Sequence, residues 1–422
     1  MSEGGSAPAE GRIVQTESWL IRVPPGIGSH SPLLVIPTVH PRGDRRVVRC
    51  AQVALDAGFR VHFLWLGEGV SSVDPAVGET LFPRPKNALA RISMVKGIAR
   101  QAAEHEATLW HIHDFYFLAA AKKRRKRGGP PVLYDVHEYY ATYYSAKVPG
   151  PRFLRESVAT AIEAYQVRSA KALGAANVAT DDMARTFRAA GVRVSVSPNY
   201  PLLEQYSDLP SVPFADRRWT VLHTGTLSRP YGTRLLIELI ARSASRGLPF
   251  EFQVLERYPS AGHEDDFRGM LDLQGPLPNL EMLPARPAHD VPKLLANAGF
   301  GLSLLQAEGQ NELAVASKSY EYTIAGLVNV VTDRVAQKRF ADSYAVPVSG
   351  HEDDVDGMLD QMMALADNPE ETARRLASTA TEARRELTWE MAVQPGLSQI
   401  MLESAQDVSP HSKQYRRRNR QR

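Results

Sequence analysis

The chain has 422 residues, a length that exceeds one typical hydrophobic core and suits two. Hydrophobic residues make up 43% and charged residues 23% of it, which is ordinary usage for a folded globular protein. The formal net charge of +3 is small for this length, and the basic excess is local. We therefore expect no nucleic-acid partner, because such proteins present a broad basic face.

Cysteine content and hydropathy exclude further classes. The single cysteine, Cys50, excludes an internal disulfide framework and a cysteine-rich zinc site. Its helical apolar surroundings favour a buried, inert thiol. No apolar stretch approaches the roughly 20 residues of a membrane span, and the first dozen residues lack the layout of a signal peptide. We expect a cytoplasmic protein, with peripheral contact to the inner membrane face left open.

Short apolar runs alternate with helical patterns through the chain. Such alternation predicts parallel sheets covered by helices, so the expected fold class is α/β, with two Rossmann-like doubly wound domains facing a cleft. Strands are predicted at 33–38, 60–66, 109–114, 132–137, around 176–180, and at 220–227, 250–255, 279–283, 299–305 and 328–332. Helices are predicted within RRVVRCAQVALDAG (45–58), with Gly58 at the C-terminus, at 88–104 and 152–173, and before the glycines that end KKRRKRGG.

Composition shifts set the expected domain boundaries. Prolines and weak periodicity mark a linker between the two alternating regions, and both chain ends are polar. The expected division is a disordered start (1–11), an acceptor-side domain (12–205), a linker (206–217), a nucleotide-sugar-binding domain (218–385), a helix returning to the first domain (386–406) and a disordered basic tail (407–422).

Candidate binding residues follow the predicted strands. In open parallel sheets, ligands bind beyond the carboxyl ends of the strands, near the point where strand order reverses. In the second half, the loop 225–232 and the segment 311–326 hold this position. In the first half, it is held by Gly43 and Asp44, His113 and Asp114, and His137 and Glu138.

The segment 311–326 carries the clearest chemical pattern. Ser317 is a suitable N-cap for a helix from Lys318 to Ala325. A helix N-terminus attracts phosphate, and the Lys318 ammonium adds a full charge there. Glu321, one turn further along, would accept hydrogen bonds from ribose hydroxyls. The alternative is a surface Lys–Glu pair, and the spacing alone does not decide between the two.

Four motifs together resemble one family. The run SKSYEYTIAGLVNVVTD is similar to the signature P-x-K-x-[FY]-E-Y-x-x-x-G-x-P-V-[IV] of family-4-type glycosyltransferases of the GT-B fold. VLYDVHEYY resembles their Asp-x-His-Glu element, TVHPRGDRRV their first loop, and SPNYP the end of their N-terminal domain. The order and spacing of the motifs agree over roughly residues 33 to 395.

The resemblance implies a metal-independent, retaining sugar transferase that uses a UDP- or GDP-type nucleotide sugar as donor substrate and no cofactor. It places His137 beside the donor sugar. A histidine there can hydrogen-bond a hydroxyl or carry a proton. Glu138 would orient His137 or the acceptor, His113 and Asp114 would line the cleft, and Asp135 is expected to be buried structure.

This chain departs from the family in the loop that binds the donor diphosphate. Where many members carry Arg and Lys, GTLSRPYG has Thr226 and Tyr231. Diphosphate binding is then expected to rest on Lys318, on Arg229 and on backbone amides around Gly225. The family's paired glutamates are not kept either, since Leu313 stands eight positions before Glu321.

No metal site is predicted, because no Asp-x-Asp follows an apolar strand. The Asp–Asp pairs at 181–182, 265–266 and 353–354 lie in helical or polar settings, where surface charge explains them. The basic run 122–127 suits a helix C-terminus, where the dipole favours cations, and an anionic membrane surface is the alternative partner.

Three other functions stay open from sequence. The chain could be a GT-B sugar-nucleotide epimerase or phosphorylase, or a catalytically weakened transferase that serves as a binding subunit. A dehydrogenase is disfavoured, because no G-x-G-x-x-G follows the first strand. The acceptor stays open among a glycan, a lipid carrier and a small natural-product aglycone, thiols included.

Overall fold

The computed structural model describes residues 11–71, 74–287 and 289–407, and these form two compact units. Unit 1 runs to Asn199 and resumes at Val393, whereas unit 2 is the continuous stretch Tyr200–Ala392. The predicted disordered segments 1–11 and 407–422 lie almost entirely outside the described residues. No helix within the described ranges is both long and apolar enough to cross a membrane.

Unit 1 is built on a parallel sheet of seven strands in the order β5-β4-β3-β6-β7-β8-β9. Its central strands are buried on both faces, as their continuous apolar runs predict. Strand order reverses between β3 and β6. The strands are β3 (Leu33–Pro41), β4 (Arg60–Leu66), β5 (Val77–Phe82), β6 (Leu109–Ile112), β7 (Val132–Val136), β8 (Gly174–Val178) and β9 (Arg193–Val196).

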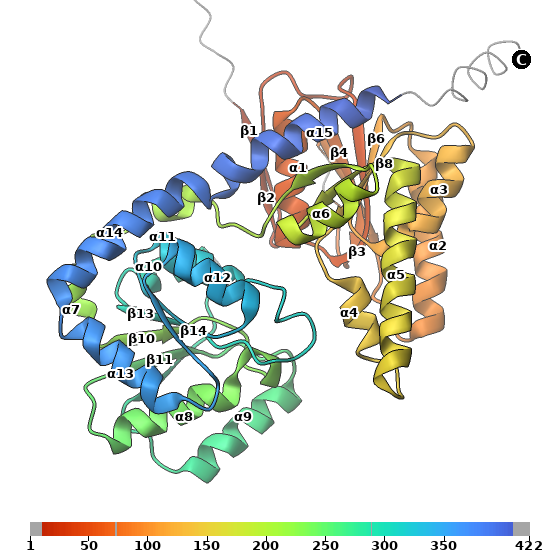
Figure 1. Cartoon of the computed structure of the whole chain (residues 1–422). Helices are drawn as coiled ribbons and strands as arrows, with labels where there is room; N and C mark the ends of the chain where they lie inside the picture. The colour runs from red at the N-terminus through yellow and green to blue at the C-terminus, as the bar shows by residue number, and fades with distance from the viewer. Residues whose placement is uncertain (1–10, 72–73, 288, 408–422) are drawn as a thin grey trace, which may run out of the picture. The chain divides into compact units, whose positions relative to one another are not determined.

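Helices cover both faces of this sheet (Figure 1). One face carries α1 (Arg45–Asp56) and the last helix, α15 (Gln394–Gln406), which pack together. The other carries α2 (Ala88–Glu104), α3 (Leu118–Lys126) and α5 (Arg152–Leu173). The remaining elements are the antiparallel pair β1 (Arg12–Gln15) and β2 (Leu20–Val23), the helices α4 (Tyr140–Ser145) and α6 (Asp181–Ala189), and the turn η1 (Phe115–Phe117).

Unit 2 repeats the plan with six parallel strands in the order β12-β11-β10-β13-β14-β15. Here the order reverses between β10 and β13, so each unit has one switch point of the kind that binds ligands. The strands are β10 (Thr220–His223), β11 (Glu251–Leu255), β12 (Leu280–Leu283), β13 (Phe300–Ser303), β14 (Val328–Thr332) and β15 (Pro347–Gly350).

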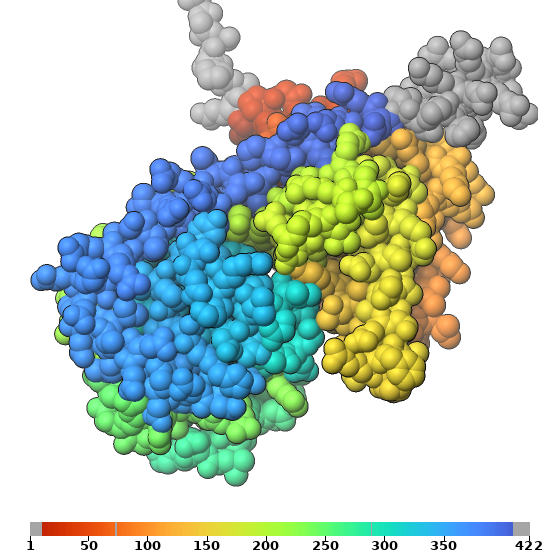
Figure 2. Space-filling view, viewed as in Figure 1, coloured from red at the N-terminus to blue at the C-terminus, as the bar shows by residue number. Residues whose placement is uncertain are grey.

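Two apolar clusters fill the faces of the second sheet. One lies under α8 (Thr233–Ser245), α9 (Ala261–Gln274) and α13 (Val355–Ala366). The other lies under α10 (Val291–Leu295), α11 (Ser317–Ile324), α12 (Val335–Tyr344) and the end of α14 (Pro369–Glu386). In Figure 2, α13 and α14, in blue, form much of the visible surface of unit 2. Its short elements are η2 (Leu203–Tyr206), α7 (Phe214–Arg217), η3 (Arg229–Tyr231) and a π-helical turn η4 (Trp389–Val393) that ends one residue into unit 1.

Candidate active site

Polar side chains gather at the carboxyl ends of β3, β6 and β7 in unit 1. These strands are neighbours in the sheet, so residues that follow them in sequence lie close together. His40 lies near the end of β3, His113 and Asp114 follow β6, and His137 and Glu138 follow β7. Because strand order reverses between β3 and β6, this polar cluster lies at the switch point of unit 1.

Asp135, at the end of β7, is fully buried and holds the polar cluster together. Its carboxylate accepts two hydrogen bonds from Arg46, at 2.9 and 3.1 Å, and one from Asn177 at 2.7 Å. Burial raises the pKa of this carboxyl, but the Arg46 charge and the neighbouring histidines outweigh burial and hold it well below its usual range. Asp135 is therefore a permanent anion, as its expected structural role requires.

His137 is oriented by this anion. Its Nδ1 lies 3.1 Å from Oδ1 of Asp135, and a carboxylate can only accept, so Nδ1 carries the proton. In the neutral ring, Nε2 then has the lone pair that accepts a proton or a hydrogen bond from a substrate hydroxyl. A carboxylate that fixes the histidine tautomer in this way is a recurring arrangement in general-base sites.

His40 is a second histidine of the polar cluster that sequence reasoning missed. Its Nδ1 lies 3.1 Å from Asp44, its Nε2 lies 3.6 Å from Asp114, and its ring centre is 4.8 Å from that of His137. Burial lowers the pKa of His40, but the hydrogen bond to Asp44 and the charges of Asp114, Asp44 and Asp135 prevail and raise it to about 9. His40 is therefore a cation at neutral pH.

The loop after β3 has the conformation that its glycine permits. Gly43 has φ 81°, and a Cβ there would lie 2.5 Å from the carbonyl oxygen of Ser18, so only glycine fits. Asp44 caps α1 through the backbone amides of Arg46 and Val47, at 3.0 and 3.1 Å. The aspartate thus serves both as a helix cap and as the partner of His40.

The side chains of His113 and Asp114 are buried. Asp114 accepts hydrogen bonds from the Thr38 hydroxyl at 2.7 Å and from the Val39 amide at 2.8 Å, which ties β6 to β3. His113 has no exposed surface, and burial places its pKa well below the usual range, so the ring is neutral. That these two residues line a substrate cleft stays a prediction.

Four buried residues in and around the polar cluster offer ligand atoms that all lie within 4.8 Å of one another: Cys50, His111, His113 and Asp135. Sequence analysis excluded a cysteine-rich zinc site but did not foresee this mixed set, which is of the type that zinc accepts. Both carboxylate oxygens of Asp135 are already hydrogen-bonded, and the Arg46 charge would repel a cation. Among the described residues, the ring nitrogens of His111 and His113 have no hydrogen-bond partner.

The corresponding position in unit 2 holds a buried lysine. Lys318 reaches from α11 to the end of β10, where its Nζ lies 3.4 Å from Nε2 of His223. A Cβ on Gly225 would overlap Nζ, so this loop needs glycine to admit the ammonium group. The helix begins at Ser317 with Ala316 as N-cap, which corrects by one residue the start and the cap expected from sequence.

The surroundings of Lys318 are electropositive. Burial lowers the pKa of its ammonium, the charge of Arg257 lowers it further, Glu321 opposes both, and the result is about 7. Arg257 follows β11 and donates a hydrogen bond to the Thr224 carbonyl at 3.4 Å. In the part of the chain that the structure describes, no ion pair joins Lys318 or Arg257 to a carboxylate. Two cations are thus held where strand order reverses, a suitable place for an anionic ligand.

The loop that departs from the family pattern lies beside these cations. Thr226 is half-buried, and Tyr231 is 41% exposed. The Arg229 side chain is 91% exposed, and its nearest carboxylate is Glu308 at 3.9 Å. Arg229 is therefore an exposed cation, whereas the charge of Arg257 lowers the pKa of Lys318.

Comparison with solved structures decides the fold. The chain is similar to HepE of Anabaena in complex with UDP, at 12% identity and TM-score 0.63, over 88% of this chain and 99% of HepE. It is also similar to sucrose-phosphate synthase of Thermosynechococcus elongatus, at 14% identity and TM-score 0.65, over 89% of this chain and 100% of the synthase. A third similar structure is the trehalose-6-phosphate synthase of Burkholderia multivorans, at 13% identity and TM-score 0.63, over 92% and 98% of the two chains.

The chain has the GT-B fold. At these identities the likeness establishes the fold alone, and the α/β class with two parallel doubly wound sheets is confirmed. Residues 43–200 match the model of the family Glycosyltransferase Family 4, which confirms the resemblance read from the motifs. No curated protein matches the chain in a sequence comparison.

The basic run at 122–127 lies at the C-terminal end of α3 in unit 1. It forms the C-terminal part of the helix and the C-cap, Arg127. Three of its side chains donate to neighbouring groups: Lys122 to Ser169, Arg124 to the Ala103 carbonyl and Arg125 to the Asp407 carbonyl. These contacts support the structural interpretation of the run. Contact with a membrane surface stays a prediction.

Proposed function

We propose that this GT-B protein is a glycosyltransferase that moves a sugar from a nucleotide diphosphate sugar to an acceptor. One observation carries the proposal: a buried Lys318 beside Arg257 at the switch point of unit 2. Burying a cation without a carboxylate partner is costly, and a diphosphate that binds there would repay that cost. Unit 2 is accordingly the donor-binding unit, and Glu321 is the residue assigned to the ribose.

UDP is the proposed nucleotide. The structures similar to this chain include HepE with UDP and with UDP-glucose. The departing diphosphate would be stabilised by Lys318, Arg257 and the amides around Gly225, with retention of configuration and no metal, as the motif resemblance implies. Thr226 stays assigned to donor binding through this loop, whereas Arg257 replaces the exposed Arg229 as the second cation in this proposal.

Unit 1 supplies the groups proposed for the reacting sugar and the acceptor. His137, with Nδ1 held by Asp135, presents Nε2 as the proton or hydrogen-bond acceptor. Glu138 follows it and is assigned to positioning. His40, protonated because its pKa is about 9, adds a positive charge 4.8 Å from the His137 ring, measured between ring centres.

Calorimetric titration with UDP, GDP and dTDP tests the proposal. We expect UDP to bind at least about tenfold more tightly than the other two, which corresponds to about 1.4 kcal/mol. Uridine serves as the control ligand, because it lacks the diphosphate that the cations contact. If none of the three diphosphates bound, the chain would be a binding subunit that has lost its donor site. The Thr226 and Tyr231 departures motivate that alternative.

Replacement of single arginines by alanine tests which cation takes the place of the Arg and Lys that bind the diphosphate in many family members. We expect Arg257→Ala to weaken UDP binding at least about tenfold, because a charge-assisted hydrogen bond contributes about 1.5–3 kcal/mol. Arg229→Ala is the matched variant, since Arg229 lies in the adjoining loop with 91% of its side chain exposed. A larger loss from Arg229→Ala would restore the assignment made from sequence. Thermal unfolding of both variants separates lost contacts from lost structure.

A further inference from the structure

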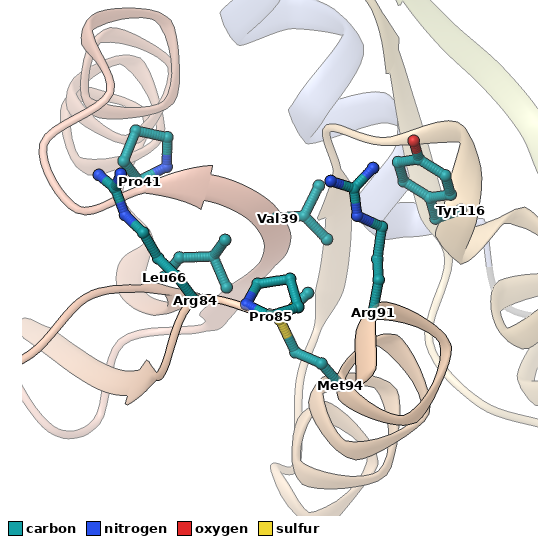
Figure 3. Close-up of a pocket in the computed structure, with 8 residues that line it drawn as sticks. All are labelled: Val39, Pro41, Leu66, Arg84, Pro85, Arg91, Met94 and Tyr116. Carbon is teal, nitrogen blue, oxygen red and sulfur yellow. The ribbon is translucent and has the colours of Figure 1, made fainter. Parts of the chain in front are cut away.

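Unit 1 contains a pocket of about 350 Å³ that the roles assigned so far do not use (Figure 3). This volume lies within the usual range for small-molecule sites. The pocket is formed by the ends of β3 and β4, the segment after β5, the first turns of α2 and the turn η1. Its apolar wall includes Val39, Leu66 and Met94, and Tyr116 adds an aromatic ring with a hydroxyl.

The pocket adjoins the polar cluster that holds His40 and His137. The Val39 amide donates to Asp114 at 2.8 Å, and Asp114 is also the partner of His40. Tyr116 lies two residues after Asp114, and its hydroxyl is hydrogen-bonded to that of Tyr144. The pocket therefore lies beside the end of β3 that carries His40, whose ring centre is 4.8 Å from that of His137.

Two arginines give the pocket its charge. Figure 3 shows Arg91 between Val39 and Tyr116, and Arg84 on the other side of the pocket. Within the described ranges, no hydrogen bond or ion pair joins either guanidinium group to a protein carboxylate. Arg42 offers a contrast, because Glu79 binds it through two hydrogen bonds, at 3.1 and 2.5 Å.

Unpaired exposed arginines are common on protein surfaces. Here, however, the two flank an apolar pocket, so a ligand that fills the pocket brings its polar end to a guanidinium group. Guanidinium groups recognise phosphate and carboxylate oxygens through paired N–H donors. A phosphate monoester carries a charge of about −1.5 to −2 at pH 7, which matches two cations.

We propose that this pocket is the acceptor subsite and that the acceptor is a phosphate ester of an apolar alcohol, recognised by Arg84 and Arg91. The proposal rests on the glycosyltransferase function proposed above. The apolar wall would hold the organic body, and the arginines would hold the phosphate. The same chemistry is present in a soluble phosphate ester and in a lipid-linked phosphate.

Matched small ligands test the recognition of phosphate. We expect the full chain to bind phenyl phosphate at least about tenfold more tightly than phenol or inorganic phosphate. The Arg84→Gln/Arg91→Gln double variant should lose at least that factor, about 1.4 kcal/mol. Lys96→Gln is the control, because Lys96 is an exposed cation on the same helix outside the pocket. Equal affinity for phenol and phenyl phosphate, or an equal loss in Lys96→Gln, would overturn the proposal.

Vesicles separate the two sources of phosphate. Phosphatidylcholine vesicles with and without phosphatidic acid are sedimented with the wild type and with the arginine double variant. Binding that needs both phosphatidic acid and the two arginines supports a lipid-linked acceptor, whereas arginine-dependent binding of phenyl phosphate alone supports a soluble one. If the double variant still binds the vesicles and the wild type does not bind phenyl phosphate, the pocket is not the phosphate-binding acceptor subsite. UDP affinity of the wild type is measured in parallel. Absence of UDP binding would refute the proposed transferase function. UDP binding together with phenyl phosphate and vesicle binding that do not depend on the two arginines would refute only the acceptor assignment.

Discussion

Replacement of Lys318 by methionine is expected to weaken UDP binding about 10- to 100-fold and to leave uridine binding within about twofold. The methionine side chain fills a similar volume but removes the ammonium group, and charge-assisted contacts to phosphate contribute about 1.5–3 kcal/mol. The structure supports the selectivity, because Nζ extends across Gly225 to His223 at the end of β10.

Lys338→Met is the control for this experiment. Lys338 is also a lysine of unit 2, but its side chain is 45% exposed and is paired with Asp342 at 2.7 Å. Its replacement should not change UDP affinity. Equal losses for UDP and uridine in the Lys318 variant would mean that the lysine supports the fold of the site and does not contact phosphate.

The pH dependence of UDP binding follows from the lowered pKa of Lys318, about 7. The ammonium form binds the diphosphate, and it is the main form below pH 7. Above pH 7 the neutral amine prevails in the free protein, so a proton must be taken up on binding. Affinity should therefore fall as pH rises through 7, by up to about tenfold per unit. The Lys318→Met variant should lose this dependence, and calorimetry in two buffers of different ionisation enthalpy would measure the proton uptake.

The sequence predicted the central elements of both sheets because those strands are buried on both faces. The strand at 60–66 and the helices at 88–104 and 152–173 have the predicted bounds. Of the four edge strands, β12 was predicted, whereas β5, β9 and β15 were missed because their sequences alternate or are short. β5, for example, has the sequence VGETLF with only two buried residues, and β15 is PVSG.

The candidate site was predicted where a motif names a residue, and missed where only the fold brings residues together. His137 and Lys318 belong to motifs. His40 lies within the first-loop run TVHPRGDRRV, but the resemblance gives it no role. Its charge depends on Asp44, four residues further along the same loop, and on Asp114, which the sheet brings to it from the end of β6. Arg257 likewise follows β11 without a motif, and its effect on Lys318 comes from the adjacency of β10 and β11. A search of every strand end for cations would have found it.

Replacement of His137 by alanine is expected to lower donor turnover by about 100-fold or more while leaving UDP affinity within about twofold. A positioned general base contributes about 10²–10⁴-fold, and His137 is held for such a role by the bond from Nδ1 to Asp135. UDP affinity should persist because the proposed diphosphate contacts belong to unit 2. Release of UDP from UDP-glucose measures turnover without a known acceptor.

The split between turnover and binding decides the role of His137, because a group that acts only in the transition state changes the rate and not ground-state affinity. His30→Ala is the control, since His30 is an exposed histidine of unit 1 outside the polar cluster. Turnover within a few fold of wild type in His137→Ala would transfer the role to another histidine of the cluster. His40 would be a poor base, because with a pKa of about 9 it already holds its proton at neutral pH. His113 would then be the residue to test, although its burial means that a substrate reaches it only if side chains above it move.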